Sequence, residues 1–213
     1  MLKIKNDIHT SLSFGKPVAL VLLDLSAAFD TIDHSNLLNR LKSCFGFTGN
    51  ALKWFTSYMA DRKQCVKIED VLSEAKNLDY GVPQGSVLGP VLFTLYTTPL
   101  SKIISAYKNI KHHLYADDTQ VYINITSENA PSAINELQNC LNDIQDWMSS
   151  NKLKLNPDKT EFILFGTPAQ RKKLESFFPV NILGNSLSPA KFAKNLGVTF
   201  DADFTFKKHV YYM

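Results

Sequence analysis

His113-Leu-Tyr-Ala-Asp-Asp-Thr-Gln-Val-Tyr-Ile-Asn-Ile125 is the stretch that decides the fold of this 213-residue chain. Apolar and polar residues alternate on both sides of Asp117 and Asp118, which predicts a tight β-hairpin with two carboxylates at its tip. Adjacent like charges repel, and a hard divalent cation with oxygen ligands would offset that repulsion. The alternative is a solvated turn that happens to carry two acids.

A third carboxylate ends a buried strand much earlier in the chain. The run Val18-Ala-Leu-Val-Leu-Leu-Asp24 is apolar up to Asp24. Two strands that each deliver acids at their ends can hold the two metal ions of a phosphoryl-transfer site. Asp24, Asp117 and Asp118 are therefore candidate metal ligands. The competing interpretation treats Asp24 as an unrelated strand-end residue.

Composition indicates an ordinary globular protein with a mildly basic surface. Hydrophobic residues make up 45% of the chain and charged residues 20%, with a formal net charge of +3. Of the 23 cations, only three are arginines: Arg40, Arg62 and Arg171. Because lysine attracts phosphate diffusely, we expect any nucleic acid to be held by its backbone with little reading of bases.

Neither a targeting signal nor a membrane segment is evident. Lys3, Lys5 and Asp7 interrupt the amino end, so we expect no signal peptide. Glycines and prolines break the uncharged stretch 80–101, which argues against a membrane helix. The three cysteines fit neither a zinc spacing nor a disulfide framework, and we expect buried, reduced thiols. These features favour an intracellular protein without membrane contact, in either the nucleus or the cytoplasm.

Helical and strand-like segments are mixed along the chain rather than strictly alternating. The hydrophobic periodicity predicts helices over 34–45, 48–59, 87–107 and 131–150, and one or two helical turns within 1–13. It predicts strands over 18–24, 63–80, 113–125, 153–156 and 161–165, with a hairpin about 184–185. This pattern favours an α+β fold, with helices packed on one face of a mostly antiparallel sheet.

Five segments, in order, resemble the motifs of reverse transcriptases from LINE-type (non-LTR) retrotransposons. Leu23-Asp-Leu-Ser-Ala-Ala-Phe-Asp-Thr-Ile-Asp-His34 is similar to motif A, and Gly81-Val-Pro-Gln-Gly-Ser-Val-Leu-Gly-Pro90 to motif B. Tyr115-Ala-Asp-Asp118 is similar to motif C, and 147–160 to motif D. Lys194-Asn-Leu-Gly-Val198 resembles the element that leads toward the primer grip. Within this group, the motif sequences are most similar to those of jockey-type elements.

This resemblance implies a polymerase palm with a metal site. Asp24, Asp117 and Asp118 would bind two Mg²⁺ ions, with Mn²⁺ as an alternative, and the backbone carbonyl of Leu25 would be a further ligand. Phe29 would be the steric gate, an aromatic ring that leaves no volume for a 2′-hydroxyl. Outside such a motif, Phe29 would be interpreted simply as a core residue.

The resemblance also implies substrate-contacting residues. Gln84 would lie against the incoming nucleotide and template base, and Gly85 would let the backbone approach the substrate closely. Lys159 would be a general acid for the departing pyrophosphate. Tyr115 would support the hairpin and touch the primer end. Without the resemblance, 83–85 is a turn before a helix and Lys159 is an ordinary turn lysine.

Several polar residues near the motifs have a structural interpretation. Asp33 and Ser35 are expected to cap the following helix. His112 and His113 could contact phosphate, but we expect their rings to find hydrogen-bond partners within the hairpin. No metal role is expected for His34.

The amino end departs from the family pattern. Residues 1–17 would be a remnant before the palm of 18–200, which holds motifs A to E, and 201–213 would begin a truncated thumb or connection. We therefore expect the fingers to be largely absent. They would have to come from a longer chain.

The function implied is that of an RNA-directed DNA polymerase, which transfers nucleotides to a primer 3′-end by two-metal chemistry. Its partners would be an RNA template, a DNA primer and deoxynucleoside triphosphates. The first rival is a catalytically inert, nucleic-acid-binding remnant. A second rival is another template-dependent polymerase, such as a group II intron-type reverse transcriptase or a viral RNA polymerase, which Phe29 disfavours. A third is a purely structural α+β domain.

Overall fold

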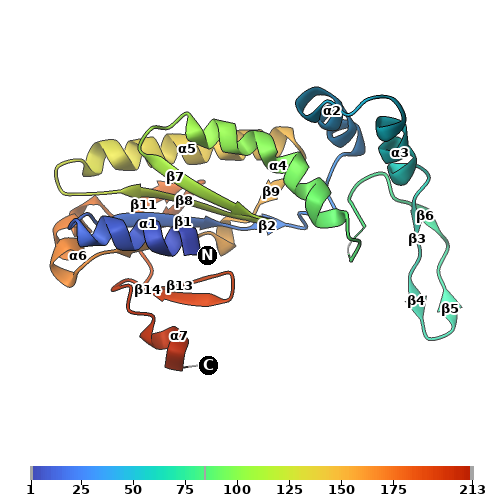
Figure 1. The fold of residues 1–213 in the computed structure, drawn as a ribbon. Helices are drawn as coiled ribbons and strands as arrows, with labels where there is room; N and C mark the ends of the chain where they lie inside the picture. Colours follow the sequence, from blue (N-terminus) through green and yellow to red (C-terminus); the bar gives the residue numbers. More distant parts are fainter. Residues whose placement is uncertain (1, 84, 212–213) are drawn as a thin grey trace. The chain divides into compact units, whose positions relative to one another are not determined.

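Four antiparallel strands in the order β10-β1-β8-β7 form the main sheet of the computed structural model, which describes residues 2–83 and 85–211 (Figure 1). Their bounds are β1 Val18–Leu23, β7 Ile110–Tyr115, β8 Asp118–Asn124 and β10 Glu161–Phe165. All six residues of β1 are buried, because β1 is a central strand with both faces covered. The expected α+β fold with an antiparallel sheet is confirmed.

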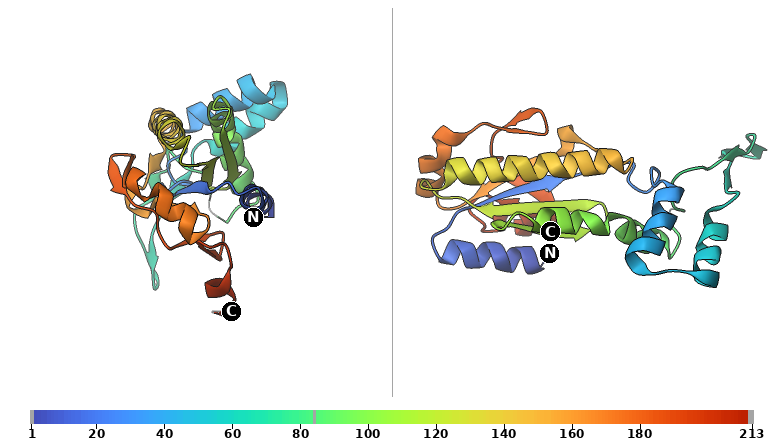
Figure 2. Two further views of the ribbon diagram at one scale, coloured as in Figure 1. Left: turned by 90° about the vertical axis from the view of Figure 1, so that its left-hand side faces the viewer. Right: turned by 90° about the horizontal axis from the view of Figure 1, so that it is seen from above.

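Helices cover both faces of this sheet (Figure 2). On one face, Val18 and Leu20 pack in a buried cluster with Ile4 and Ile8 of α1 (Leu2–Ser13). Because side chains alternate along a strand, Ala19 points to the other face. There it meets the amphipathic helix α5 (Ala130–Ser150), the strongest helical pattern of the sequence. Helices therefore pack on both faces of the sheet, and not on one face as expected. The reason is that α1 is longer than predicted and its apolar side chains join the core.

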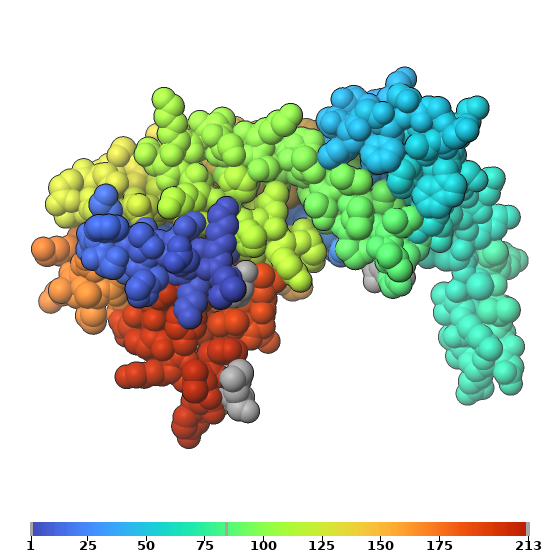
Figure 3. Space-filling model, in the orientation of Figure 1, coloured from blue at the N-terminus to red at the C-terminus, as the bar shows by residue number. Residues whose placement is uncertain are grey.

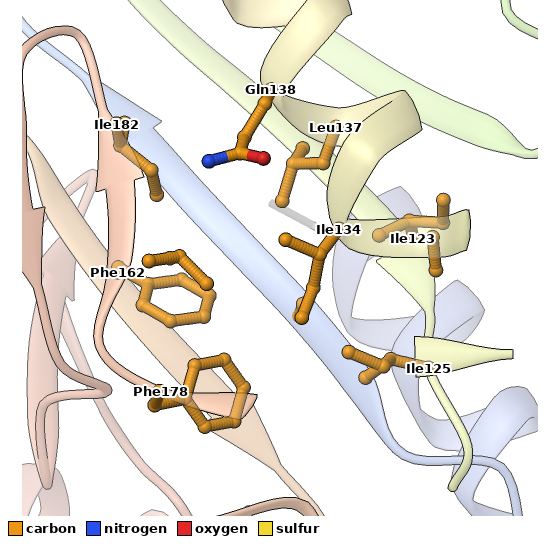
Figure 4. A pocket seen from close by; sticks show the side chains of 11 residues that line it. Ile123, Ile125, Ile134, Leu137, Gln138, Phe162, Phe178 and Ile182 are labelled. Carbon is orange, nitrogen blue, oxygen red and sulfur yellow. The ribbon is translucent and has the colours of Figure 1, made fainter. Parts of the chain in front are cut away.

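A small apolar void remains under α5 (Figure 4). Its volume is about 10 Å³, which is room for roughly one water molecule. Ile134 and Leu137 of α5 point toward Phe162 of the sheet, with Phe178 closing the other side. The void is a packing gap rather than a ligand site, because its lining is almost entirely apolar.

The chain divides into two compact units. The sheet unit comprises Met1–Ser26, Leu100–Trp147 and Leu155–Met213, and the helical unit comprises Ala27–Pro99 and Met148–Lys154. Shorter elements after the main sheet are β9 Lys154–Leu155, α6 Pro168–Leu174, β11 Val180–Ile182, β12 Asn185–Leu187, β13 Phe192–Asn195, β14 Val198–Asp201 and α7 Lys207–Tyr211. The division into 1–17, 18–200 and 201–213 stays a prediction.

The helical unit is built from α2 (His34–Phe45), α3 (Gly49–Met59) and the first part of α4 (Gly89–Ser105). Arg40 links these elements, since its guanidinium donates to the Tyr96 carbonyl and, at 2.6 Å, to Asn151 Oδ1. The Tyr96 hydroxyl, fully buried, donates to the Asn151 carbonyl at 2.7 Å. These bonds satisfy polar groups that would otherwise be costly to bury.

A long β-hairpin follows α3, where the sequence predicted one or two strands. It consists of four two-residue strands: β3 Lys63–Gln64, β4 Lys67–Ile68, β5 Val71–Leu72 and β6 Lys76–Asn77. The space-filling view shows it as a narrow arm (Figure 3). All eight strand residues are exposed.

The expectations for cysteines and for membrane helices have mixed outcomes. All three cysteines are free, as expected, but only Cys140 is buried, whereas Cys44 and Cys65 are exposed. The expectation of buried thiols is therefore wrong for two of them, which lie in the helical unit on α2 and on the exposed hairpin. Within residues 2–83 and 85–211, helices of a length and apolarity that would cross a bilayer are absent.

Candidate active site

The hairpin predicted around Asp117 and Asp118 is present. Strands β7 and β8 pair in register from Ile110–Ile123 to Tyr115–Asp118. Ala116 and Asp117 form the turn, with Ala116 at φ 50°. A non-glycine residue at positive φ is strained by roughly 1 kcal/mol. The hairpin holds this strained turn next to the two acids because a full ladder of pairs lies behind it.

Asp24 lies at the neighbouring strand end. In the β1–β8 pair, the last register partners are Leu23 and Thr119. One step further along both strands are Asp24 and Asp118, so the sheet brings an acid from much earlier in the chain beside the hairpin tip. Burial raises the pKa of Asp118, and the charges of Asp117 and Asp24 raise it further. The three carboxylates therefore interact electrostatically.

The side chain of Asp24 has one oxygen without a hydrogen-bond partner. Among the described residues, nothing donates a hydrogen bond to Asp24 Oδ2, although this atom is buried. The Lys159 ammonium lies 3.5 Å away, at ion-pair distance. The backbone is fixed independently, because the Asn156 N–H donates to the Asp24 carbonyl at 2.9 Å. A partly buried carboxylate with one oxygen that accepts no hydrogen bond, beside other acids, is a suitable partner for a cation.

The residues present thus fit a divalent metal by their chemistry. The carboxylates supply the hard oxygen ligands that such an ion prefers. In the part of the chain that the structure describes, no three Asp, Glu, His or Cys side chains converge closely enough to form a coordination shell. Asp24, Asp117 and Asp118 lie at the same end of the sheet, but their carboxylate groups do not converge on one point.

Three further predicted site residues also belong to the sheet unit. Lys159 ends a short 3₁₀ turn, Pro157–Lys159, which Asn156 caps by accepting from the Asp158 N–H. Leu25 is buried, in the two-residue strand β2 (Leu25–Ser26). The side chain of Tyr115 is 59% exposed. The structure therefore places Lys159 against Asp24, and leaves the Tyr115 ring open to solvent at the hairpin end.

Phe29 and Gly85 belong to the helical unit. The Phe29 ring is half-buried and packs on Phe93, with ring centroids 4.9 Å apart. Gly85 has φ +76°, and an added Cβ there would meet open space. Gln84 lies outside the described residues. The gate and core interpretations of Phe29 both remain compatible with its half-buried ring.

The motif-A-like and motif-B-like segments pair with each other inside the helical unit. The Val82 N–H donates to the Phe29 carbonyl at 2.8 Å, and the Gly81 N–H donates to Ile32 at 2.7 Å. A Cβ on Gly81 would lie 3.0 Å from the backbone of Asp30. Glycine is needed here because no side chain fits between the two segments.

The predicted helix cap is confirmed, and one contact was not predicted. Asp33 is the N-cap of α2 and accepts from the Asn36 N–H at 2.8 Å, while Ser35 donates to the same carboxylate. The His34 ring, for which the sequence indicates no role, lies 2.7 Å from the Gly81 carbonyl. The cap formed by Asn156 was also not predicted, although an asparagine before a proline is a known turn signal.

His112 of β7 is hydrogen-bonded within the sheet unit, to a helix rather than within the hairpin as expected. His112 shares a hydrogen bond of 2.8 Å with Ser101 of α4. Burial lowers the pKa values of His112 and His113, with nearby positive charge adding to the effect. Both rings therefore favour the neutral form.

Comparisons with known proteins show the family and the fold. Residues 6–200 match the family model for reverse transcriptase (RNA-dependent DNA polymerase). The chain is similar to the RNA-directed DNA polymerase from mobile element jockey of Drosophila funebris, with 30% identity over 88% of this chain. The corresponding protein of Drosophila melanogaster is 28% identical over 88% of the chain. The chain spans about a fifth of the length of these relatives.

Solved telomerases share the fold. Apo telomerase from Candida tropicalis aligns with a TM-score of 0.65 and 13% identity, over 97% of this chain and 34% of that one. Telomerase from Candida albicans, in complex with a fragment of telomeric RNA, aligns with a TM-score of 0.63 and 14% identity, over 95% and 32%. The family match over most of the chain, with motifs in order on a palm-like sheet, leads to one assignment. The chain belongs to the reverse transcriptase (RNA-dependent DNA polymerase) family.

Proposed function

We propose that the sheet unit carries the nucleotidyl-transfer centre of an RNA-directed DNA polymerase. The observation that supports this most is the position of Asp24 and Asp118 at adjacent ends of β1 and β8, with Asp117 in the turn. Asp24 Oδ2, which accepts no hydrogen bond and lies 3.5 Å from the Lys159 ammonium, and the raised pKa of Asp118 both favour a bound cation. The family normally uses a divalent metal.

Asp24, Asp117 and Asp118, with the Leu25 carbonyl, would hold two Mg²⁺ or Mn²⁺ ions. When bound, such ions activate the attacking hydroxyl and stabilise charge on the leaving group. In the reaction, the primer 3′-oxygen forms a bond to the α-phosphorus of a deoxynucleoside triphosphate, and the bond to pyrophosphate breaks. The hydroxyl proton passes from the attacking oxygen to solvent water, and the pyrophosphate leaves with a proton from Lys159.

The remaining predicted residues would bind or orient substrates. Lys159, whose ammonium lies 3.5 Å from Asp24, is close enough to the acids to donate a proton to the departing pyrophosphate. Tyr115, exposed at the end of β7, would contact the primer end. Phe29 would exclude a 2′-hydroxyl, and Gln84 and Gly85 would lie against the nucleotide and template. The template would be RNA and the primer DNA.

Primer extension tests the proposal. The 213-residue chain is incubated with an RNA template, a DNA primer, deoxynucleotides and Mg²⁺, beside the Asp117→Asn, Asp118→Asn double variant. We expect extension that falls at least about 100-fold in the variant, because oriented charge at the reacting phosphate contributes several kcal/mol. The matched control is Glu69→Gln, Asp70→Asn, which changes the acids of the exposed hairpin and should extend normally.

A folded chain that binds primer–template without extending it would contradict the catalytic proposal. It would favour the second candidate, a catalytically inert, nucleic-acid-binding remnant. Folding is checked by circular dichroism and a cooperative melt. Extension that survives in the Asp117→Asn, Asp118→Asn variant would show that these carboxylates are not the metal ligands.

A further inference from the structure

Helix α3 presents an exposed aromatic stack. The side chain of Trp54 is 53% exposed, and its ring stacks on that of Tyr58 with centroids 5.3 Å apart and 13° between the planes. Phe55 packs edge-on against Trp54 at 5.1 Å. Because Tyr58 and Phe55 orient the indole while more than half of it stays open, Trp54 is a rigid surface on which another flat ring can stack.

The stack continues into a cation. Arg62 Cζ lies 5.2 Å from the centroid of the Tyr58 ring, and Nη1 donates to the Tyr58 carbonyl at 3.0 Å. Trp54, Tyr58 and Arg62 follow one another at steps of four residues, so they extend along one side of the helix and its end. Aromatic rings alternating with a guanidinium are typical of surfaces that bind unpaired bases.

The surrounding charge would attract phosphate. Residues 33–63, which hold α2, α3 and Arg62, contain five lysines and arginines and two aspartates, Asp33 and Asp61. Lys42 and Lys53 are exposed on these helices. A phosphate backbone approaching this pair of helices therefore meets an excess of positive charge, since Asp33 is engaged as the cap of α2.

A satellite core and a protein-docking surface are two roles that fit this cluster less well. A small satellite core would bury its largest ring, whereas Trp54 is the most open member of the cluster and Met59, on the same helix, is buried. A protein-docking surface uses the same residue types. The excess of cations over 33–63 favours nucleic acid over a protein partner, because positive charge attracts the phosphates of a polyanion.

We propose that Trp54, Tyr58 and Arg62 form a stacking site for the bases of single-stranded nucleic acid, with Lys53 close to its phosphates. Every base has a flat face, so such a site is tolerant of sequence, in keeping with a chain of only three arginines. The inference rests on the proposed function for its ligand class, nucleic acid. It does not depend on the acids at the β7–β8 tip.

Binding of a fluorescein-labelled single-stranded oligouridylate to the 213-residue chain tests this site. Affinity is measured by fluorescence anisotropy for wild type, Trp54→Leu and Trp54→Phe. We expect Trp54→Leu to weaken binding about tenfold and Trp54→Phe to weaken it less, because base–aromatic stacking contributes roughly 1–3 kcal/mol per base. The salt dependence of binding should not change, since no phosphate contact is removed.

Trp147→Phe is the matched control, because it removes the second of the two tryptophans and leaves Trp54 as the only indole. This variant should bind like wild type, and its emission should be quenched by the oligonucleotide. A strand of abasic sites, with the same phosphates and no bases, should bind wild type and Trp54→Leu equally. This strand separates stacking from simple attraction of charge.

The outcomes also separate this inference from the proposed function. Equal affinity of wild type and Trp54→Leu for oligouridylate, with unquenched Trp54, would overturn the stacking site and leave the polymerase proposal standing. Equal weakening on the abasic strand would overturn it too, because the lost contact would not be to a base. A folded wild-type chain that binds no oligonucleotide at low salt would overturn the stacking site, and primer extension on a primer–template tests the polymerase proposal separately.

Discussion

Two β-hairpins in this chain carry a pair of adjacent acids at the tip, and only one of them forms a candidate site. In the first, Tyr115 pairs with Asp118, and Ala116 at φ 50° begins the turn. In the second, Ile68 pairs with Val71, and Glu69 at φ 53° begins a turn that contains Glu69 and Asp70. The two turns have the same length and the same positive φ at their first residue, with the pair of acids one residue earlier in the second hairpin.

Their surroundings differ completely. Strand β8 pairs on its second edge with β1, and five of its seven residues are buried. Strands β4 and β5 pair only with each other within the described chain, and Ile68 and Val71 are 70% and 72% exposed. A two-stranded hairpin gains little stability by itself. The comparison shows that a third strand, which also delivers Asp24, turns a solvated pair of acids into an electrostatically coupled site.

The largest expected difference between the hairpins is in stability. Leu20→Ala, in the β1 strand beside β8, should lower the free energy of unfolding by about 2–5 kcal/mol, because it leaves a cavity in a fully buried cluster. Val71→Ala, on the exposed hairpin, should change it by about 0.5 kcal/mol or less. Urea denaturation followed by circular dichroism measures both. Equal losses would mean that the exposed hairpin is buried in solution.

A smaller difference is expected in the response to divalent cations. At Mg²⁺ or Mn²⁺ concentrations about tenfold above the dissociation constant, binding should stabilise wild type by about 1.4 kcal/mol and raise the melting temperature by roughly 3–5 °C. The rise should persist in Glu69→Gln, Asp70→Asn and disappear in Asp117→Asn, Asp118→Asn. Thermal melts with and without EDTA provide the measurement. If the rise in melting temperature were instead lost in Glu69→Gln, Asp70→Asn, the cation would bind at the exposed β4–β5 hairpin.

The smallest expected effect is the change in the free energy of unfolding when the charge of Asp118 is removed. Its pKa is raised in the folded protein, so the carboxylate binds its proton more tightly there than in the unfolded chain. The stability contributed by this group is present below the unfolded pKa of about 3.9 and is lost as the pH rises through the raised value. Asp118→Asn should therefore stabilise the metal-free protein at about pH 7.5, by less than about 1 kcal/mol because the group is partly solvated.

This gain should shrink as the pH falls toward about 4, where Asp118 itself becomes neutral. Urea melts in EDTA at the two pH values measure it, with Asp70→Asn as the control on the exposed hairpin. A gain that grows at low pH would mean that Asp118 is stabilised as a carboxylate in the folded state, in contradiction to the raised pKa.

Much of the secondary structure was predictable from local patterns. Alternation around Asp117 predicted the β7–β8 hairpin, and the three- and four-residue period over 131–150 predicted α5. Asp33 as the cap of α2 followed from its position before an apolar period. These features depend on neighbours in sequence, so a single segment contains the information needed.

Long-range features could not be read locally. The 1–13 segment has a weak pattern, yet α1 runs for 12 residues and buries Ile4 and Ile8 against the sheet. The region 63–80 became an exposed arm rather than part of a core. The contact of His34 with the Gly81 carbonyl joins residues 47 positions apart. Each of these depends on what a distant segment offers as a packing or hydrogen-bonding partner.

By itself, the sequence determined that two acids would sit at the tip of the 113–125 hairpin and that Asp24 would end an apolar strand. The tertiary structure alone decided that this tip, and not the one at Glu69 and Asp70, receives Asp24, through the antiparallel register of β1 and β8. It also decided that Lys159 lies 3.5 Å from Asp24 and that Trp54 faces solvent on α3. The physical reason is that side-chain alternation and turn geometry act over a few residues, whereas charge coupling and burial depend on which strands pair.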